Sequence, residues 1–313
     1  MERSSLDLLD VLSFVRVVET GSFSRAAERM GVSKSILSRR VARLEDQLGA
    51  RLLLRSAQGA QPTDAGQAYY ERASTILTEL EAAREEVAES VTQVAGPLRL
   101  SAPLSFGTAY LADALAEFAR QYPRVELDIS LDDKVVDLIA GGYDAAVRIG
   151  NLPDSSLITR RIAPVRRTLV ASPDYIEAHG RPAHPRDLND HDLLLYGNGE
   201  SWRFRVDGRW YYVRGRSRLR SNNGEMMRAA AAAGLGVCIL PTFIASPALK
   251  DGTLEVLLRD FPLEEGGLHV VTPPGRARTA RVRALSDFLA ARFGPEPSWD
   301  PCWDHERAMD AAR

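Results

Sequence analysis

Basic and hydroxyl-bearing side chains gather between residues 25 and 55, where they could bind phosphates and base edges. This segment has eight lysines and arginines against three acidic residues, a formal net charge of +5, whereas residues 64–89 have seven acidic residues against two arginines. Guanidinium and ammonium groups contact phosphates and read guanine edges, and hydroxyls contact either phosphates or bases. The division of charge favours a nucleic-acid-binding surface next to an element that avoids phosphates. A solvated surface helix with ordinary charges is the alternative.

A helix over residues 33–48 would position these side chains. Its buried stripe consists of apolar residues at helical spacing: Leu37, Val41, Leu44 and Leu48. A shorter helix over residues 24–30 precedes it through a turn at Gly31, which is typical of a helix-turn-helix. Short strands over residues 51–54 and 56–61 would form a wing that reaches the sugar-phosphate backbone. The candidate DNA-binding residues are Ser33, Lys34, Ser35, Ser38, Arg39, Arg43 and Arg55.

A long helix is predicted from residue 64 to about residue 94. Its apolar residues alternate by fours and threes, which is the pattern of a coiled-coil seam. We expect the seam to pair with a second copy of the chain, although a helix packed on the C-terminal part of its own chain is the alternative. The candidate dimerisation residues are Ala73, Ile76, Leu80, Ala83 and Val87.

Residues 98–149 alternate between strands and helices. The pattern predicts strands over 98–101, 125–131 and 143–149 and helices over 104–121 and 135–140, and hence a parallel sheet. A second set follows over residues 168–271, with a hairpin around Asp207-Gly208, and a helix over 279–293 ends the pattern. Seven arginines lie between Arg203 and Arg220; a solvated hairpin is the ordinary interpretation, and a second DNA contact or an acidic ligand is the alternative.

Polar residues follow several of these strands, and ligands of open α/β folds bind beyond the carboxyl ends of strands. The start of the helix at Pro103–Ser105 offers free N–H groups that favour an anion, such as the carboxylate of a small organic molecule. Each segment taken singly could be a plain helix cap. The candidate effector-binding residues are Ser101, Pro103, Leu104, Ser105, Asn151, Trp202, Asn222 and Phe243.

The N-terminal residues resemble the DNA-binding region of LysR-type transcriptional regulators. The matching residues are Phe14, Val18, GSFSRAAERMGVSKSILSRRVARLEDQLGARLLLR at 21–55 and PTDAG at 62–66. Three positions depart from the family: Leu53 stands where Phe is usual, Pro62 where Leu is usual, and Gln58 where Arg is frequent. The segments LRLSAPLSFG, YDAAVRIGNLPDSSLITRRIA, LVASPDYI and AAAGLGVCILPTF, between residues 98 and 243, are similar to the effector-binding part of the same family.

The resemblance implies a winged helix-turn-helix over residues 1–63, a linker helix over 64–95 and an α/β effector-binding domain over 96–294. That domain would have the fold of periplasmic solute-binding proteins, with subdomain I over 96–165 and 273–294 and subdomain II over 166–272. The tail over 295–313 matches nothing known and is interpreted as an appendix. The expected partners are palindromic double-stranded DNA, a small-molecule effector and further copies of the chain in a homodimer or homotetramer.

An enzyme, or a small-molecule-binding protein without DNA regulation, is the alternative function. The five histidines show no metal-binding spacing, and no Gly-rich phosphate loop or nucleophile elbow is present. Cys302 and His305 supply only two ligands, so we expect neither a metal nor a cofactor. Without a signal-peptide pattern or an apolar stretch long enough to span a bilayer, the chain is expected to be cytoplasmic. A disulfide between Cys238 and Cys302 is not expected there.

Overall fold

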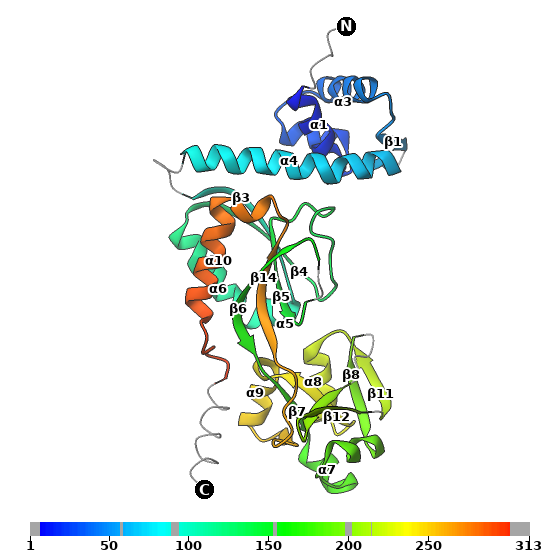
Figure 1. The fold of residues 1–313 in the computed structure, drawn as a ribbon, viewed down its shortest axis with the longest axis vertical. Coiled ribbons are helices and arrows are strands. Elements are labelled where there is room, and N and C mark those ends of the chain that lie inside the picture. The colour runs from blue at the N-terminus through cyan, green and yellow to red at the C-terminus, as the bar shows by residue number, and fades with distance from the viewer. Residues whose placement is uncertain are drawn as a thin grey trace.

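The computed structural model describes residues 7–56, 59–88, 94–152, 155–197, 202–213 and 215–300. The molecule is elongated, with a small helical unit at one end, the long helix α4 lying across it, and two α/β subdomains below (Figure 1). We name the subdomains by their five-stranded sheets. The first subdomain has the strand order β4-β3-β5-β14-β6, and the second has the order β11-β8-β12-β7-β13.

The N-terminal unit is a helix-turn-helix with a wing, as predicted. It consists of α1 (Leu8–Thr20), α2 (Phe23–Arg29), α3 (Lys34–Leu48), β1 (Leu53–Ser56) and β2 (Gly59–Pro62). Ser22 and Ser33 cap α2 and α3, because their hydroxyls accept hydrogen bonds from the N–H groups of Arg25 and Ile36. The helices share a core in which Phe14, Leu37 and Val41 are fully buried, so one hydrophobic cluster orients α3.

Helix α4 (Asp64–Ala88) packs partly on its own chain. Ala73, predicted in the dimer seam, is only 4% exposed and belongs to the N-terminal core. The prediction that Ala73 lies in a dimer seam is wrong, because this residue is buried in the core of its own N-terminal unit. The Tyr70 hydroxyl donates a hydrogen bond to the Ile139 carbonyl oxygen, which joins α4 to the first subdomain. The predicted residues 89–93 of the helix and the side chain of Val87 lie outside the described residues.

The first subdomain has helices on one face of its sheet. Its elements are β3 (Ala95–Ala102), α5 (Leu104–Phe106), a π-helical turn (Gly107–Leu111), α6 (Ala112–Gln121), β4 (Arg124–Leu131), β5 (Ala145–Gly150), β6 (Ile158–Val165), β14 (Gly266–Thr272), a 3₁₀ turn (Arg276–Arg278) and α10 (Ala280–Phe293). Strand β3 runs parallel to β4 and β5, whereas β14 runs antiparallel to β5 and β6. Helices α6 and α10 cover the same face (Figure 1).

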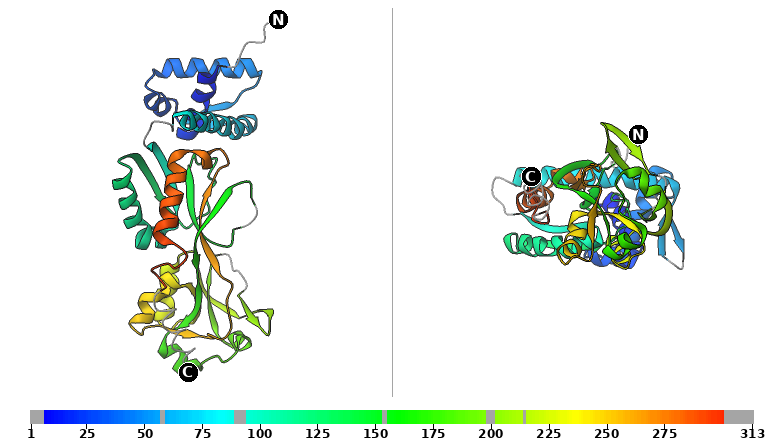
Figure 2. Two further views of the ribbon diagram at one scale, coloured as in Figure 1. Left: turned by 60° about the vertical axis from the view of Figure 1, so that its left-hand side comes forward. Right: turned by 90° about the horizontal axis from the view of Figure 1, so that it is seen from below.

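The second subdomain is also built on a five-stranded sheet, but helices lie on both of its faces. Its elements are β7 (Arg167–Ala171), α7 (Pro173–His179), a 3₁₀ helix (Pro185–Asp190), β8 (Asp192–Tyr196), β11 (Arg216–Ser221), α8 (Gly224–Ala232), β12 (Val237–Pro241), α9 (Thr242–Lys250) and β13 (Glu255–Leu257). The hairpin of β9 (Arg203–Val206) and β10 (Arg209–Tyr212) forms around Asp207-Gly208, as predicted. Two extended segments connect the subdomains (Figure 2). Only Arg166 separates β6 from β7, and the return lies before Gly266 rather than near residue 273.

The predicted helix over residues 135–140 is absent: residues 135–137 have no regular structure, and residues 138–140 lie in a turn. The Asp137 carboxylate accepts hydrogen bonds from the N–H groups of Ile139 and Ala140, both at 2.9 Å. Such a side chain offers the backbone an alternative to helical hydrogen bonds. Gly141 and Gly142 follow at once, so the segment turns back toward β5 instead of continuing as a helix.

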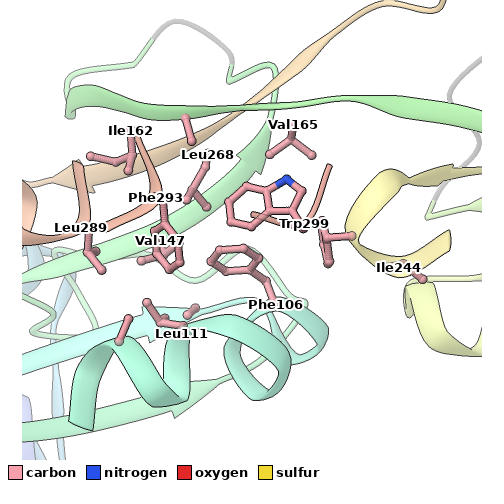
Figure 3. Packing of buried hydrophobic residues seen from close by; sticks show 14 of the residues in the cluster. Phe106, Leu111, Val147, Ile162, Val165, Ile244, Leu268, Leu289, Phe293 and Trp299 are labelled. Atoms are coloured by element: carbon pink, nitrogen blue, oxygen red, sulfur yellow. The ribbon is translucent and has the colours of Figure 1, made fainter. Parts of the chain in front are cut away.

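The start of the C-terminal tail is part of the main core, which corrects its interpretation as an appendix. Trp299 is 2% exposed, and its ring lies 5.4 Å from the rings of Phe106 and Phe293 between centroids. Figure 3 shows Trp299 beside Phe106, with Ile244 of α9 nearby. The buried Asp300 carboxylate contacts the guanidinium of Arg166 at 2.8 Å. The tail therefore packs where the chain crosses between the subdomains; residues 301–313 lie outside the described residues.

Candidate DNA-binding surface and effector cleft

The exposed face of α3 has the composition that DNA reading requires. The buried stripe of Leu37, Val41 and Leu44 leaves the side chains of Lys34, Ser35 and Arg39 exposed, and Ser38 is half-buried. The Ser33 and Ser35 hydroxyl oxygens lie 2.9 Å apart at the start of the helix. Arg39 contacts only the Ser35 carbonyl oxygen, at 3.4 Å, among the described contacts. A guanidinium held this loosely can turn toward a base edge.

Arg43 has a structural contact that the sequence did not reveal. Its guanidinium donates to both carboxylate oxygens of Asp10, at 2.5 and 2.6 Å, and Asp10 is fully buried on α1. The hydrogen bond and the charge of Asp10 raise the pKa of Arg43. The bidentate pair fixes α3 against α1. A DNA contact by Arg43 stays a prediction.

The wing is held against the turn between α1 and α2. The Ala60 N–H donates to the Gly21 carbonyl oxygen at 3.0 Å, and a Cβ on Gly59 would lie 2.6 Å from that oxygen. Leu53, where the family usually has Phe, is buried in the N-terminal core. Arg55 lies in β1 opposite Ala60, but its side chain is outside the described residues, so its phosphate contact also stays a prediction.

An acidic side chain already occupies the helix start where the sequence predicted an anion. The Asp133 carboxylate accepts a hydrogen bond from the Leu104 N–H at 3.0 Å. Its other oxygen accepts from the Asn223 side-chain amide, also at 3.0 Å, which links the two subdomains. Asn222, the predicted contact, is exposed beside this bridge. The candidate residues named from the sequence did not include Asp133 or Asn223, although each is the second residue after the end of a strand.

Ser101, predicted to bind the effector, makes a side-chain contact within the first subdomain. It is fully buried near the end of β3, and its hydroxyl oxygen accepts a hydrogen bond from Arg148 of β5 at 3.1 Å. Burial lowers the pKa of Arg148. Asn151 follows the same strand and is exposed. Ser105 is 8% exposed, and its hydroxyl has no hydrogen-bond partner in the described structure.

Two aromatic residues predicted to line the cleft are enclosed in protein cores instead. Trp202 is 9% exposed and belongs to the core of the second subdomain together with Tyr175 and Phe204. Phe243 is 6% exposed and packs edge-on against Phe106, with 5.4 Å between ring centroids. Their rings are therefore covered by neighbouring side chains and do not form an apolar wall for a ligand.

The other predicted effector-binding residues at the start of α5, Pro103 and Leu104, make no described side-chain hydrogen bond. Pro103 precedes α5 and supplies no side-chain cap, and Leu104 is 42% exposed. On the facing subdomain, Tyr196 is 49% exposed; partial burial and the charge of Asp133 raise the pKa of its phenol, which at neutral pH is a hydrogen-bond donor like any tyrosine.

Three of the seven arginines between Arg203 and Arg220 make ordinary ion pairs. Arg203 pairs with Glu264, and Arg216 and Arg218 both pair with Asp192.

The described residues contain no group of three side chains that could hold a metal ion. None of their helices is long and apolar enough to cross a membrane. Cys238 is buried, which raises the pKa of its thiol, while Cys302 and His305 lie outside the described residues.

Two family models match the chain. Residues 8–67 match the bacterial regulatory helix-turn-helix protein of the lysR family, and residues 92–294 match the LysR substrate binding domain. An uncharacterized HTH-type transcriptional regulator of Haemophilus influenzae is 35% identical over 294 residues, covering 90% of this chain and 99% of that protein. The HTH-type transcriptional regulator PtxR of Pseudomonas aeruginosa is 33% identical over 295 residues, covering 93% and 95%.

Solved structures of full-length regulators are similar as well. CrgA of Neisseria meningitidis, a LysR-type transcriptional regulator, is 31% identical with a TM-score of 0.56, covering 90% of this chain and 97% of that one. A full-length OxyR variant from Pseudomonas aeruginosa has a TM-score of 0.72 at 24% identity, covering 94% and 96%. At 24% identity, the similarity to OxyR shows only that the two chains share a fold.

Proposed function

Because this chain belongs to the LysR family of transcriptional regulators, we propose that it binds palindromic double-stranded DNA as a homodimer under the control of a small organic anion. Its helix-turn-helix and substrate-binding domain are those of a regulator and not of an enzyme. The site of action is the cytoplasm, where bacterial DNA is found.

The exposed face of α3 is the observation that carries the DNA-binding proposal. Lys34, Ser35 and Arg39 lie on one side of a helix whose opposite side is fully buried. The Arg43–Asp10 pair and the serine cap hold the helix in place before DNA arrives. A fixed helix with basic and hydroxyl-bearing side chains fits the major groove.

A second copy of the chain is the proposed partner of α4. Ile76 is 61% exposed and Leu80 43% exposed, and Ala83 is exposed one turn further along the same stripe. An apolar stripe at positions i, i+4 and i+7 is what a partner helix buries. Dimerisation sets two recognition helices against half-sites about one helical turn apart, or a multiple of it. A homotetramer would repeat this pairing.

The effector is proposed to be a small organic anion between the subdomains. The Asp133 carboxylate at the start of α5 excludes a second anion from that position by charge repulsion. The support for an anion comes instead from Arg148, whose described contacts are the Ser101 hydroxyl and the Val147 carbonyl oxygen, both neutral. A ligand acts on transcription only if it binds one arrangement of the subdomains better than the other.

A gel-shift titration tests the DNA-binding proposal. Arg39→Ala is expected to weaken binding to a selected DNA site by roughly 1–3 kcal/mol and to relax its specificity, because one base contact is lost. Lys250→Ala is the control, since Lys250 is an exposed basic residue on α9 in the second subdomain. If Arg39→Ala and Lys250→Ala both bind like the wild type, α3 is not the reading helix.

A further inference from the structure

A cavity of about 470 Å³ lies between α9, β13 and the start of the C-terminal tail. One face of α9 forms a wall of it, with lining residues at positions i, i+4, i+7 and i+8: Thr242, Ser246, Leu249 and Lys250. Small-molecule sites have volumes of roughly 300–1,000 Å³. The described lining includes none of the predicted effector-binding residues, so this cavity is separate from the predicted cleft.

The floor of the cavity is apolar. It consists of side chains that are buried or half-buried: Leu249, Leu254, Val256 and Trp299. Ser246 adds a hydroxyl to the wall, which can donate one hydrogen bond. An apolar floor with a few polar groups suits the hydrocarbon part of a small organic ligand.

Basic residues outnumber acidic ones in the lining. The basic residues are exposed at the cavity: Arg181, Lys250 and Arg259. The two acidic residues already have partners, because Glu255 pairs with Arg181 and Asp300 pairs with Arg166. The charge that remains at the cavity is therefore positive and attracts an anion.

Lys250 supplies a charge that no described carboxylate compensates. It is the last residue of α9, lines the cavity and makes no ion pair among the described contacts. The neighbouring Asp251 carboxylate accepts hydrogen bonds from the N–H and the hydroxyl of Thr253 instead. The Lys250 ammonium is therefore available to the carboxylate of a ligand.

The wall of the cavity is tied to the crossing between the subdomains. The Asp300 carboxylate accepts a hydrogen bond from the Thr242 hydroxyl and contacts the guanidinium of Arg166 at 2.8 Å. The Thr242 N–H donates to the Arg166 carbonyl oxygen at 2.9 Å. Because Arg166 is the one residue between β6 and β7, a ligand in the cavity would lie against the residues that hold this crossing.

We propose that this cavity is a second small-molecule site, which binds an amphipathic organic anion with one carboxylate on an apolar chain or ring. The carboxylate lies at Lys250 and Arg259, where charge-assisted hydrogen bonds hold it. The apolar part lies on Leu249 and Val256. An occupant that prefers one arrangement of the subdomains would shift their equilibrium through the crossing. The site neither uses the proposed effector cleft nor requires DNA binding.

NMR of the lysine side chains in the full chain tests this site. The chain has only the three lysines Lys34, Lys134 and Lys250, and reductive methylation labels each with carbon-13 while keeping its charge. Octanoate is the probe. We expect a saturable shift of the Lys250 signal, which is assigned by its loss in Lys250→Arg. Lys34 on α3 and Lys134, next to Asp133 of the predicted cleft, are the internal controls.

Two variants and a second probe locate the ligand within the cavity. Ser246→Leu places a larger side chain in it and should weaken octanoate binding about tenfold or more, whereas Ser217→Leu, at an exposed position of β11, should not. Lys250→Gln should weaken binding measured by calorimetry about fivefold, because an exposed ionic contact is lost. Octylammonium, with the opposite charge on the same chain, should not saturate, because Lys250 and Arg259 repel it.

The outcomes decide for or against the cavity. No saturable shift of Lys250, a shift confined to Lys34 or Lys134, or equal saturation by octanoate and octylammonium overturns the site. Equal affinities of Ser246→Leu and Ser217→Leu overturn it as well. If circular dichroism shows that Ser246→Leu does not fold, Lys250→Gln decides, and an unchanged affinity there rejects the proposal. Gel shifts are independent of these results, since the cavity lies outside the DNA-binding unit.

Discussion

Truncating Trp299 to alanine tests whether the C-terminal tail belongs to the core. The indole is 2% exposed and packs against Phe106, Tyr110 and Phe293 with centroid distances of 5.3 to 5.4 Å. Replacing a buried Trp or Phe by alanine costs on the order of 3–5 kcal/mol, through lost burial and the cavity left behind. We expect a loss of about 4 kcal/mol for Trp299→Ala, a large part of the roughly 5–15 kcal/mol by which an ordinary native protein is stable.

Urea unfolding of the full chain, followed by far-UV circular dichroism, measures this loss in the transition of the α/β subdomains. Trp210→Ala is the matched control, because Trp210 is 38% exposed on the β9–β10 hairpin and contacts Arg203 and Arg205 by cation–π interactions. An exposed cation–π contact contributes about 0.5–1 kcal/mol. If both substitutions cost the same small amount, the packing of the tail on the core is refuted.

Three further perturbations test the dimer, the recognition helix and a buried histidine. Leu80→Asp should lower the mass measured by light scattering to that of one chain, because it places a charge in the proposed seam. The control Val135→Asp changes a residue that is 91% exposed and should leave this mass unchanged. Arg43→Ala should lower the melting temperature of the N-terminal unit because buried Asp10 loses its partner, and adding Asp10→Ala should restore part of it. Burial lowers the pKa of His191 in the folded chain below its ordinary 6.5. Below about pH 6.5 the unfolded chain therefore binds more protons at this residue than the folded chain does, and the free energy of unfolding should fall as the pH drops. The fall should be smaller in His191→Gln.

The N-terminal unit could be predicted from the sequence because its signals are local. Helical spacing of Leu37, Val41 and Leu44 marks the buried side of α3, and Ser33 marks its start. Strands β3, β4 and β5 of the first subdomain were also predicted near their observed positions, whereas β6 and β14 were not predicted as strands of this sheet. Ala73 shows the limit of this reasoning, because a heptad pattern does not tell which neighbour buries each position. Ala73 is buried in the core of its own N-terminal unit, whereas Ile76 and Leu80 further along α4 are exposed.

The cleft was harder to predict because its contacts join distant segments. Asp133 bonds to Asn223 across 90 positions of sequence, and Arg148 bonds to Ser101 across 47. Residue type and strand position indicated where polar groups would gather, but they did not show that a carboxylate would occupy the start of α5. Trp202 was misplaced for a related reason, since a large aromatic residue fits a core as well as a ligand wall.

Selection of DNA from a random library by the purified full-length chain tests the central claim most directly. The account predicts enrichment of an inverted repeat whose half-sites lie about one helical turn, or a multiple of it, apart, because two α3 helices read it from a dimer. Arg39→Ala should lose enrichment at particular bases within each half-site. Recovery of unenriched sequences, or of a single half-site without its inverted copy, would contradict the assignment of this protein as a dimeric, sequence-specific regulator.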